Sequence, residues 1–178
     1  MAGRAPGEGR YAHLEREQRW IARAVPPDAG RPVSIVDRYI SGTRLRLRRS
    51  ESDGEVVFKL GQKVRSDPAD PEVLKLTNLY LSAEEYAVLA ALAASESRKT
   101  RWHATWEGRT VSIDQFRGRL DGLVLAEVEL GADEPLLSPP PYALRDVTNE
   151  DRFSGGALAF ASDAAVAALL IEVAAAAR

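Results

Sequence analysis

Hydrophobic and polar residues alternate with a period of two along much of this chain, a pattern typical of β-strands. In Thr43–Arg49, arginines at alternate positions share one face and leucines share the other. Glu55–Lys63, across a Ser-Asp-Gly turn, places Lys59 and Lys63 opposite Phe58. Like charges side by side on a sheet destabilise it unless an anion lies between them. The pattern predicts either two neighbouring strands that share a buried cationic face, or an amphipathic sheet whose basic face is solvated.

Two further strands place carboxylates at alternate positions. In Leu14–Trp20, Glu15 and Glu17 share a face with Arg19, and Glu127 and Glu129 repeat this spacing inside an apolar segment. One Glu-x-Glu strand taken alone is more often a solvated edge or the start of a helix. Because buried carboxylates need water or a charged partner, the two strands together predict one acidic cluster.

The remaining pattern predicts a mainly β fold with a few helices. Further strands are expected at Ser34–Ile40, Val73–Leu81, Arg98–Gly108 and Arg109–Phe116, with loops at Pro26–Gly30, Arg65–Glu72 and Ser138–Ser154. Ser82 and Glu85 form a capping box that opens a helix over Ser82–Ser95, and a second helix is expected over Ser162–Arg178. About eight strands with so few helices predict a sheet that closes on itself or nearly so.

Composition narrows the class of protein. The 178 residues, 45% of them hydrophobic, are enough for one core, so we expect a single domain over residues 13–178 after a disordered tail over residues 1–12. The chain has no cysteine, which excludes disulfides, thiolate metal sites and cysteine nucleophiles. His13 and His103 have no second histidine at ligand spacing, so neither is assigned to a metal.

Charge and hydropathy point away from two kinds of partner. A formal net charge of -2 lacks the basic excess of a nucleic-acid binder. No leader-like or membrane-spanning apolar run is present in the sequence, so a cytoplasmic protein without a membrane partner is expected. A glycine-rich phosphate loop is also absent, which argues against a P-loop enzyme.

Six motifs follow one another along the chain, at Glu15–Arg19, Leu45–Arg49, Phe58–Lys63, Lys99–Trp102, Asp114–Glu129 and Asp146–Ser154. In kind and order they resemble those of the CYTH superfamily, the triphosphate tunnel metalloenzymes. The resemblance implies a closed, eight-stranded antiparallel β-barrel with a charged interior and helices packed outside. It also implies a triphosphate or polyphosphate ligand, and it leaves a homodimer open.

The resemblance and the chemistry of the side chains together give a set of candidate site residues. Glu15, Glu17, Glu127 and Glu129 suit a hard cation such as Mg²⁺ or Mn²⁺, and with Lys63 they are the candidate catalytic residues. The candidate substrate-binding residues are the cations Arg19, Arg46, Arg48, Lys59, Lys63, Lys99, Arg101 and Arg152. The predicted function is metal-dependent hydrolysis of a triphosphate; an adenylate cyclase and a non-catalytic polyphosphate binder are the alternatives.

The chain departs from the family pattern in three places. Arg19 replaces a lysine. The strand after the lysine strand carries Lys75, Thr77 and Leu79 where many members have an arginine and two glutamates. Gly155 and Gly156 stand where an asparagine and a lysine are common. These differences bear on substrate choice and rate more than on fold.

Overall fold

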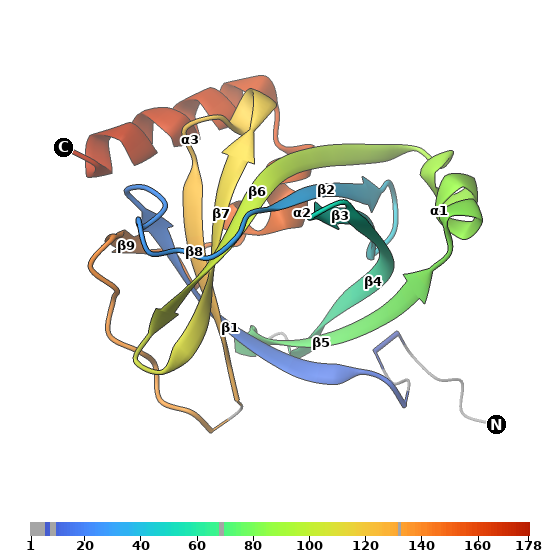
Figure 1. Ribbon diagram of the computed structural model, residues 1–178, viewed down its shortest axis with the longest axis horizontal. Coiled ribbons are helices and arrows are strands. Elements are labelled where there is room, and N and C mark those ends of the chain that lie inside the picture. The colour runs from blue at the N-terminus through green and yellow to red at the C-terminus, as the bar shows by residue number, and fades with distance from the viewer. Residues whose placement is uncertain (1–5, 8–9, 68–69, 132) are drawn as a thin grey trace.

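The computed structural model describes residues 6–7, 10–67, 70–131 and 133–178 and consists mainly of antiparallel strands (Figure 1). The strands are β1 (His13–Ala22), β2 (Val33–Ile40), β3 (Leu45–Ser52), β4 (Glu55–Asp67), β5 (Asp70–Leu81), β6 (Ala94–Trp106), β7 (Arg109–Arg117), β8 (Val124–Leu130) and β9 (Ala143–Asp146). The helices are α1 (Ala83–Ala90), α2 (Gly155–Phe160) and α3 (Asp163–Ala176), with short 3-10 turns η1 (Gly118–Leu120) and η2 (Asp151–Phe153).

Eight strands close into a barrel, as predicted. The order β5-β4-β3-β2-β6-β7-β8-β1 is completed by pairing of β1 with β5. One edge of β1 is shared: its first residues pair with β5, from His13 opposite Leu76 to Arg16 opposite Val73. Its last residues, from Trp20, pair with β9. Because the sheet closes on itself, every inward-facing side chain points into one enclosed lumen.

Alternation along the strands separates a charged interior from an apolar exterior. On β3, Leu47 is fully buried on the outer face, whereas Arg46 and Arg48 point inward beside Asp37 of β2. On β4, Phe58 faces outward, and its ring lies 4.5 Å from that of Tyr86 in α1. The outer faces of β1, β7 and β8 carry a second apolar cluster that includes Trp20, covered by the chain around Leu137 and Tyr142.

One end of the barrel is filled by an apolar plug. Ile21, Phe116 and Leu125 continue the inward-facing rows beyond the charged residues. They pack with Phe153 of η2, Leu158 of α2 and a buried stripe of α3. In Figure 1, α3 lies beside the ends of β7 and β8. The lumen is therefore charged along its middle and closed by packed side chains at one end.

Several boundaries differ from those expected. The predicted loop at Arg65–Glu72 is wrong, because β4 runs to Asp67 and β5 starts at Asp70, with residues 68–69 outside the described part. The first helix stops at Ala90 instead of Ser95, since Ala94 pairs with Ile40 in the ladder between β6 and β2. The Ser138–Ser154 loop contains β9 and η2, and α2 was not predicted.

Two local predictions agree with the structure. The capping box forms. The backbone N–H of Glu85 donates to the Ser82 hydroxyl, and the backbone N–H of Ser82 donates to the Glu85 carboxylate. The C-terminal helix begins after its N-cap Ser162. Most of the predicted N-terminal tail, residues 1–5 and 8–9, lies outside the described residues. Within the described part, none of the helices has the length and hydropathy needed to cross a membrane.

Candidate functional site

Charged side chains from seven strands form a connected set of ion pairs across the lumen, which we call the tunnel network. Its members are Glu15, Glu17 and Arg19 (β1), Asp37 (β2), Arg46 and Arg48 (β3), Lys63 (β4), Lys99 and Arg101 (β6), Asp114 (β7) and Glu127 (β8). Two predicted residues of these strands are not members of the network but lie beside it: Lys59 is directly opposite Arg48, and Glu129 is directly opposite Glu17. The network explains how so many cations are accommodated inside a barrel, since each lies near a carboxylate.

The glutamates of β1 hold two cations that come from different parts of the chain. Lys63 Nζ lies 2.6 Å from Glu15 Oε2 and 2.7 Å from Glu17 Oε1. Arg19 donates from Nη2 to Glu17 at 2.9 Å and from Nε to Glu127 at 2.6 Å. The ladder between β1 and β8 places Arg19 directly opposite Glu127. Glu15, Glu17 and Glu127 are therefore linked to one another through Lys63 and Arg19.

Two aspartates that the sequence analysis did not select form the other half of the network. Asp37 is 1% exposed and accepts from Arg48 Nε at 2.6 Å and Arg48 Nη2 at 2.7 Å. Asp114, also 1% exposed, accepts from both Lys99 and Arg101. Both could have been selected from the sequence, because each is a lone aspartate in an apolar strand segment. Strands disfavour aspartate, and a buried carboxylate needs a cation as its partner.

Two inward-facing cations are less well compensated. Arg46 Nε is 3.6 Å from Asp37 Oδ1, whose carboxylate is already taken by Arg48, and this buried nitrogen has no hydrogen-bond partner among the described residues. Lys59 lies directly opposite Arg48, and its Nζ is 4.8 Å from the centre of the exposed Tyr80 ring. These groups retain donors for an anion in the lumen.

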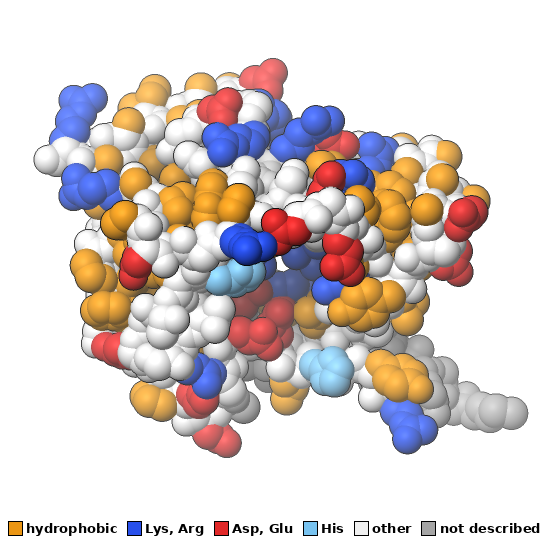
Figure 2. All heavy atoms as spheres, in the orientation of Figure 1, with side chains coloured by type: hydrophobic (Ala, Val, Ile, Leu, Met, Phe, Trp, Pro, Cys, Tyr) orange, Lys and Arg blue, Asp and Glu red, His pale blue; other side chains and the backbone are white. Residues whose placement is uncertain are grey.

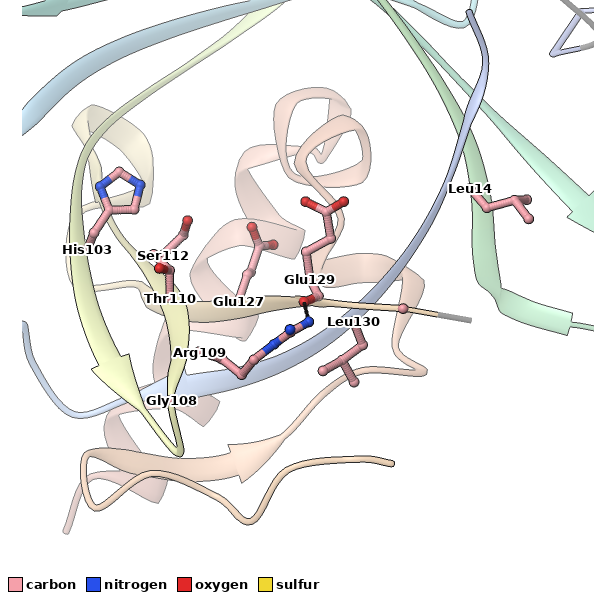
Figure 3. A pocket seen from close by; sticks show the side chains of 10 residues that line it. Leu14, His103, Gly108, Arg109, Thr110, Ser112, Glu127, Glu129 and Leu130 are labelled. Carbon is pink, nitrogen blue, oxygen red and sulfur yellow. Dashed lines mark hydrogen bonds between the residues drawn. The ribbon is translucent and has the colours of Figure 1, made fainter. Parts of the chain in front are cut away.

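A cavity of about 580 Å³ opens beside the glutamates of β8. Figure 2 shows a hollow near the centre of this face, with acidic and basic side chains inside it. In the close view of Figure 3, Glu127 and Glu129 point the same way from β8, while His103 and Ser112 approach from β6 and β7. The short side chains of Thr110 and Ser112 on β7 leave this space open next to Glu127.

Burial and ion pairing shift the pKa values of the network in opposite directions. Burial alone would raise the pKa of Asp37, but Arg48, Arg46 and Lys99 together hold it well below its usual range. Glu127 is likewise desolvated, yet Arg19, Lys99 and Arg101 lower its pKa strongly. Glu15 differs, because burial and then repulsion by Glu17 raise its pKa despite the nearby Lys63. Of these three carboxylates, Glu15 is therefore the one whose negative charge is least stabilised.

The donor set fits a hard cation in its chemistry. Glu17 and Glu129 are directly opposite each other on β1 and β8, a like-charge pair that a cation would stabilise. Glu15 Oε2 is buried and, although close to Lys63 Nζ, forms no well-oriented hydrogen bond. In the arrangement seen across residues 6–7, 10–67, 70–131 and 133–178, no three acidic or histidine side chains are grouped closely enough to hold a metal ion. Arg19 and Lys63 occupy the carboxylates instead.

Known proteins resemble the chain in fold and, over a shorter stretch, in sequence. No family model matches it. An inorganic triphosphatase from Acetivibrio thermocellus is 36% identical over 55 residues, which cover 31% of this chain and 35% of that protein. The inorganic triphosphatase NE1496 superposes with a TM-score of 0.57 at 21% identity, over 83% of this chain and 95% of that one. The chain has the CYTH, or triphosphate tunnel, fold. The PH1819 protein from Pyrococcus horikoshii OT3 also superposes, with a TM-score of 0.51 at 17% identity over 91% of this chain and 89% of that one.

Strand register corrects one comparison with the CYTH pattern. Lys63 is opposite Leu76 and Gly61 is opposite Asn78, so the even-numbered residues of β5 face the lumen. Thr77 and Leu79 face outward, and Leu79 is 52% exposed. Thr77 and Leu79, which the sequence comparison matched to the acidic pair of the family, therefore point away from the lumen.

Arg152 is a predicted binding residue that the structure places away from the lumen. It lies in η2 on the barrel exterior, and its side chain is 48% exposed. Its guanidinium donates to Glu150 and to Glu172 of α3, and it stacks on the Phe153 ring at 5.0 Å. These contacts anchor η2 against α3, next to the apolar plug, so Arg152 does not belong with the candidate substrate-binding residues of the lumen.

Proposed function

We propose that this protein is a metal-dependent triphosphatase that binds its substrate, inorganic triphosphate or a small organic triphosphate, in the tunnel. The observation that carries this proposal is the convergence of Arg19, Arg46, Arg48, Lys59, Lys63, Lys99 and Arg101 on one lumen that also contains glutamates. The local similarity to an inorganic triphosphatase supports the same reaction class.

The cations of the lumen would bind and orient the phosphate chain. Guanidinium and ammonium groups form charge-assisted hydrogen bonds to non-bridging phosphate oxygens, and arginine can do so with two parallel bonds. Arg46 and Lys59 are the first candidates, because the carboxylates leave their donors least occupied. Hydrolysis of a phosphoanhydride depends mainly on positioning and on stabilising charge as the bond breaks, and a fixed set of cations in a partly enclosed lumen supplies both.

The glutamates Glu15, Glu17, Glu127 and Glu129 are the residues that would hold Mg²⁺ or Mn²⁺. When bound, such an ion neutralises phosphate charge and can activate a water for attack at phosphorus. Arg19 and Lys63 now occupy these carboxylates, so they are the two cations whose partners must change when the site is loaded. In this proposal, Arg19 and Lys63 bind the substrate when it is present and pair with the glutamates when it is absent.

A non-catalytic polyphosphate binder is the second candidate. The inward-facing residues of β5 whose side chains are described, Leu74, Leu76, Asn78 and Tyr80, include no carboxylate. A binder needs only the basic residues, whereas hydrolysis also needs the glutamates. The cavity beside Glu127 and Glu129 leaves room for an organic group, so a cyclase acting on a nucleoside triphosphate is the third outcome to test.

The decisive experiment measures phosphate, pyrophosphate and cyclic nucleotide release from tripolyphosphate, thiamine triphosphate and ATP, with Mg²⁺ or Mn²⁺. The proposal expects metal-dependent phosphate release from at least one substrate. Tight tripolyphosphate binding without any product would favour the binder, and cyclic nucleotide formation would favour the cyclase.

Matched variants test whether the lumen is the site. Lys63→Ala removes a cation of the lumen, whereas Lys75→Ala removes one from the outer face of the adjacent strand. We expect Lys63→Ala to weaken tripolyphosphate binding by about 1.5–3 kcal/mol, the usual contribution of a hydrogen bond to a charged group, and to lower turnover at saturating substrate. Equal effects of the two variants would show that the site is elsewhere.

A further inference from the structure

Tyr39 stands at the inner end of the charged lumen. It lies two residues after Asp37 on β2 and directly opposite Arg46 on β3, so its side chain faces inward. Burial and then the Asp37 carboxylate raise the pKa of Tyr39, although the nearby Arg46 and Arg48 oppose the shift. The phenol therefore stays protonated. Its ring also contacts Gly155 and Gly156, the first two residues of α2.

The contact at Gly155 leaves no room for a side chain. A Cβ on Gly155 would lie 2.0 Å from the Tyr39 hydroxyl oxygen and 3.1 Å from Cζ. The backbone does not require glycine here, because Gly155 is not among the glycines with positive φ. A Cβ on Gly156 would lie 3.6 and 3.7 Å from two ring carbons of Tyr39, which is ordinary van der Waals contact. The need for glycine at position 155 thus comes from the position of the Tyr39 hydroxyl.

The lumen turns apolar near Tyr39, because α2, whose first two residues contact the Tyr39 ring, also supplies Leu158 to the plug. The inward-facing rows turn apolar at Ile21, Phe116 and Leu125, which pack with Phe153 and Leu158 in the plug. Lys99 reaches this region, with its Nζ 5.5 Å from the centre of the Phe116 ring, but it is bound to Asp114. Arg46 differs, because its buried Nε has no hydrogen-bond partner within the described part of the chain. An anion that enters from the open end would therefore meet available donors at Arg46 and the Tyr39 hydroxyl.

We propose that Tyr39, held in place by Gly155, determines the length of phosphate chain that this tunnel accepts. The terminal phosphate of a short linear chain is stopped at Arg46, and Gly155 acts as a positioning residue through Tyr39. The inference rests on the proposed function only in that phosphate enters the lumen. It concerns binding and does not require hydrolysis.

The test compares dissociation constants for pyrophosphate, tripolyphosphate and tetrapolyphosphate, measured by titration calorimetry. Gly155→Ala would push the Tyr39 ring toward the open end, and Gly156→Ala is the matched control in the same helical turn. We expect Gly155→Ala to weaken tripolyphosphate binding by at least about tenfold, equivalent to the loss of one charge-assisted hydrogen bond. Pyrophosphate binding should change by less than about threefold, because a shorter chain still fits. Gly156→Ala should keep the wild-type preference.

Two variants of Tyr39 separate a length effect from a general loss of structure. Tyr39→Phe in the Gly155→Ala background removes the hydroxyl oxygen that would lie 2.0 Å from the new Cβ and leaves Cζ at 3.1 Å, a contact that a small shift of the ring relieves. The double variant should therefore recover most of the tripolyphosphate preference of Tyr39→Phe alone. Tyr39→Ala removes the stop and should bring the tetrapolyphosphate constant closer to that of tripolyphosphate. Both variants remain informative if Gly155→Ala does not fold, since neither retains that clash.

Each outcome bears on a different proposal. Ratios between the three ligands that stay within about twofold of wild type in Gly155→Ala and in Tyr39→Ala would overturn the length determinant, even if the enzyme hydrolyses tripolyphosphate. Wild-type protein that binds tripolyphosphate without hydrolysing it would overturn the proposed hydrolysis and leave the length preference measurable. Wild-type protein that binds none of the three ligands would overturn both.

Discussion

Replacement of Asp37 by asparagine tests the tunnel network most directly, because it should change stability and ligand affinity in opposite directions. Asp37 is fully buried and is the shared partner of Arg48, Arg46 and Lys99. Asp37→Asn keeps the shape of the side chain and removes its charge. The three cations then remain in the lumen without the carboxylate that holds them.

The expected loss of stability is large for a single substitution. Removing one partner of a buried ion pair costs about 3–5 kcal/mol, because the other charge stays buried and uncompensated. A domain of this size has a total stability of about 5–15 kcal/mol. With a urea dependence of about 2 kcal/mol per molar, the unfolding midpoint should fall by about 1.5–2.5 M.

Affinity for a polyanion should rise in the same variant. A phosphate charge about 8 Å from the Asp37 carboxylate, at an effective dielectric constant of about 20, is repelled by about 2 kcal/mol. Removing that repulsion should tighten tripolyphosphate binding by roughly thirtyfold. Tripolyphosphate at one fixed concentration should therefore raise the free energy of unfolding of Asp37→Asn by more than that of the wild type. A ligand that binds only the folded state stabilises it more when its affinity is higher.

Urea unfolding followed by circular dichroism, with and without tripolyphosphate, measures both effects. Asp53→Asn is the matched control, because Asp53 pairs with Arg31 at the surface, where the side chains are 65% and 82% exposed. Such a pair contributes about 0.2–1 kcal/mol, and asparagine tolerates the positive φ of this turn position. The reasoning fails if Asp37→Asn is no less stable than Asp53→Asn, or if it is destabilised and binds tripolyphosphate no more tightly than the wild type.

Three further outcomes are expected. The pKa of Asp37 is lowered in the folded state, so the stability that its ionised carboxylate contributes is complete above the unfolded pKa of about 3.9 and is lost as pH falls below that value. Urea titrations should therefore show a constant stability difference between wild type and Asp37→Asn above about pH 5, and a smaller difference at lower pH. Glu129→Gln should abolish metal-dependent turnover while calorimetry shows unchanged or tighter tripolyphosphate binding, and retained turnover would reject Glu129 as a metal ligand. Phe153→Ala should lower the free energy of unfolding by about 3–5 kcal/mol, since its fully buried ring joins η2 to the plug, and a loss below about 1 kcal/mol would contradict that role.

The sequence by itself determined which side chains alternate on each strand. Residues i and i+2 share a face whatever the rest of the fold does, so spacing alone groups Arg46 with Arg48, and Glu15 with Glu17. A second local pattern, Ser-x-x-Glu, predicted the capping box at Ser82. The sequence could also have identified Asp37 and Asp114, because each is a single carboxylate within an apolar strand segment.

Only the tertiary structure decided which faces point inward and which charges meet. On β5, pairing with β4 turns Leu76 and Asn78 toward the lumen, although the sequence comparison had selected Thr77 and Leu79. A shift of one residue in register exchanges the two faces of a strand, and register depends on a partner strand elsewhere in the chain.

Long-range contacts set the remaining features of the site. Glu17 meets Lys63, 46 residues away, and Arg19 meets Glu127, 108 residues away, only because the barrel closes. Arg152 stands in a recognisable motif, yet contact with Glu172 on α3 holds it on the exterior. Local sequence contains the period of each strand, but the partners of a side chain are fixed when distant strands pair, since pairing brings together residues that no local pattern connects.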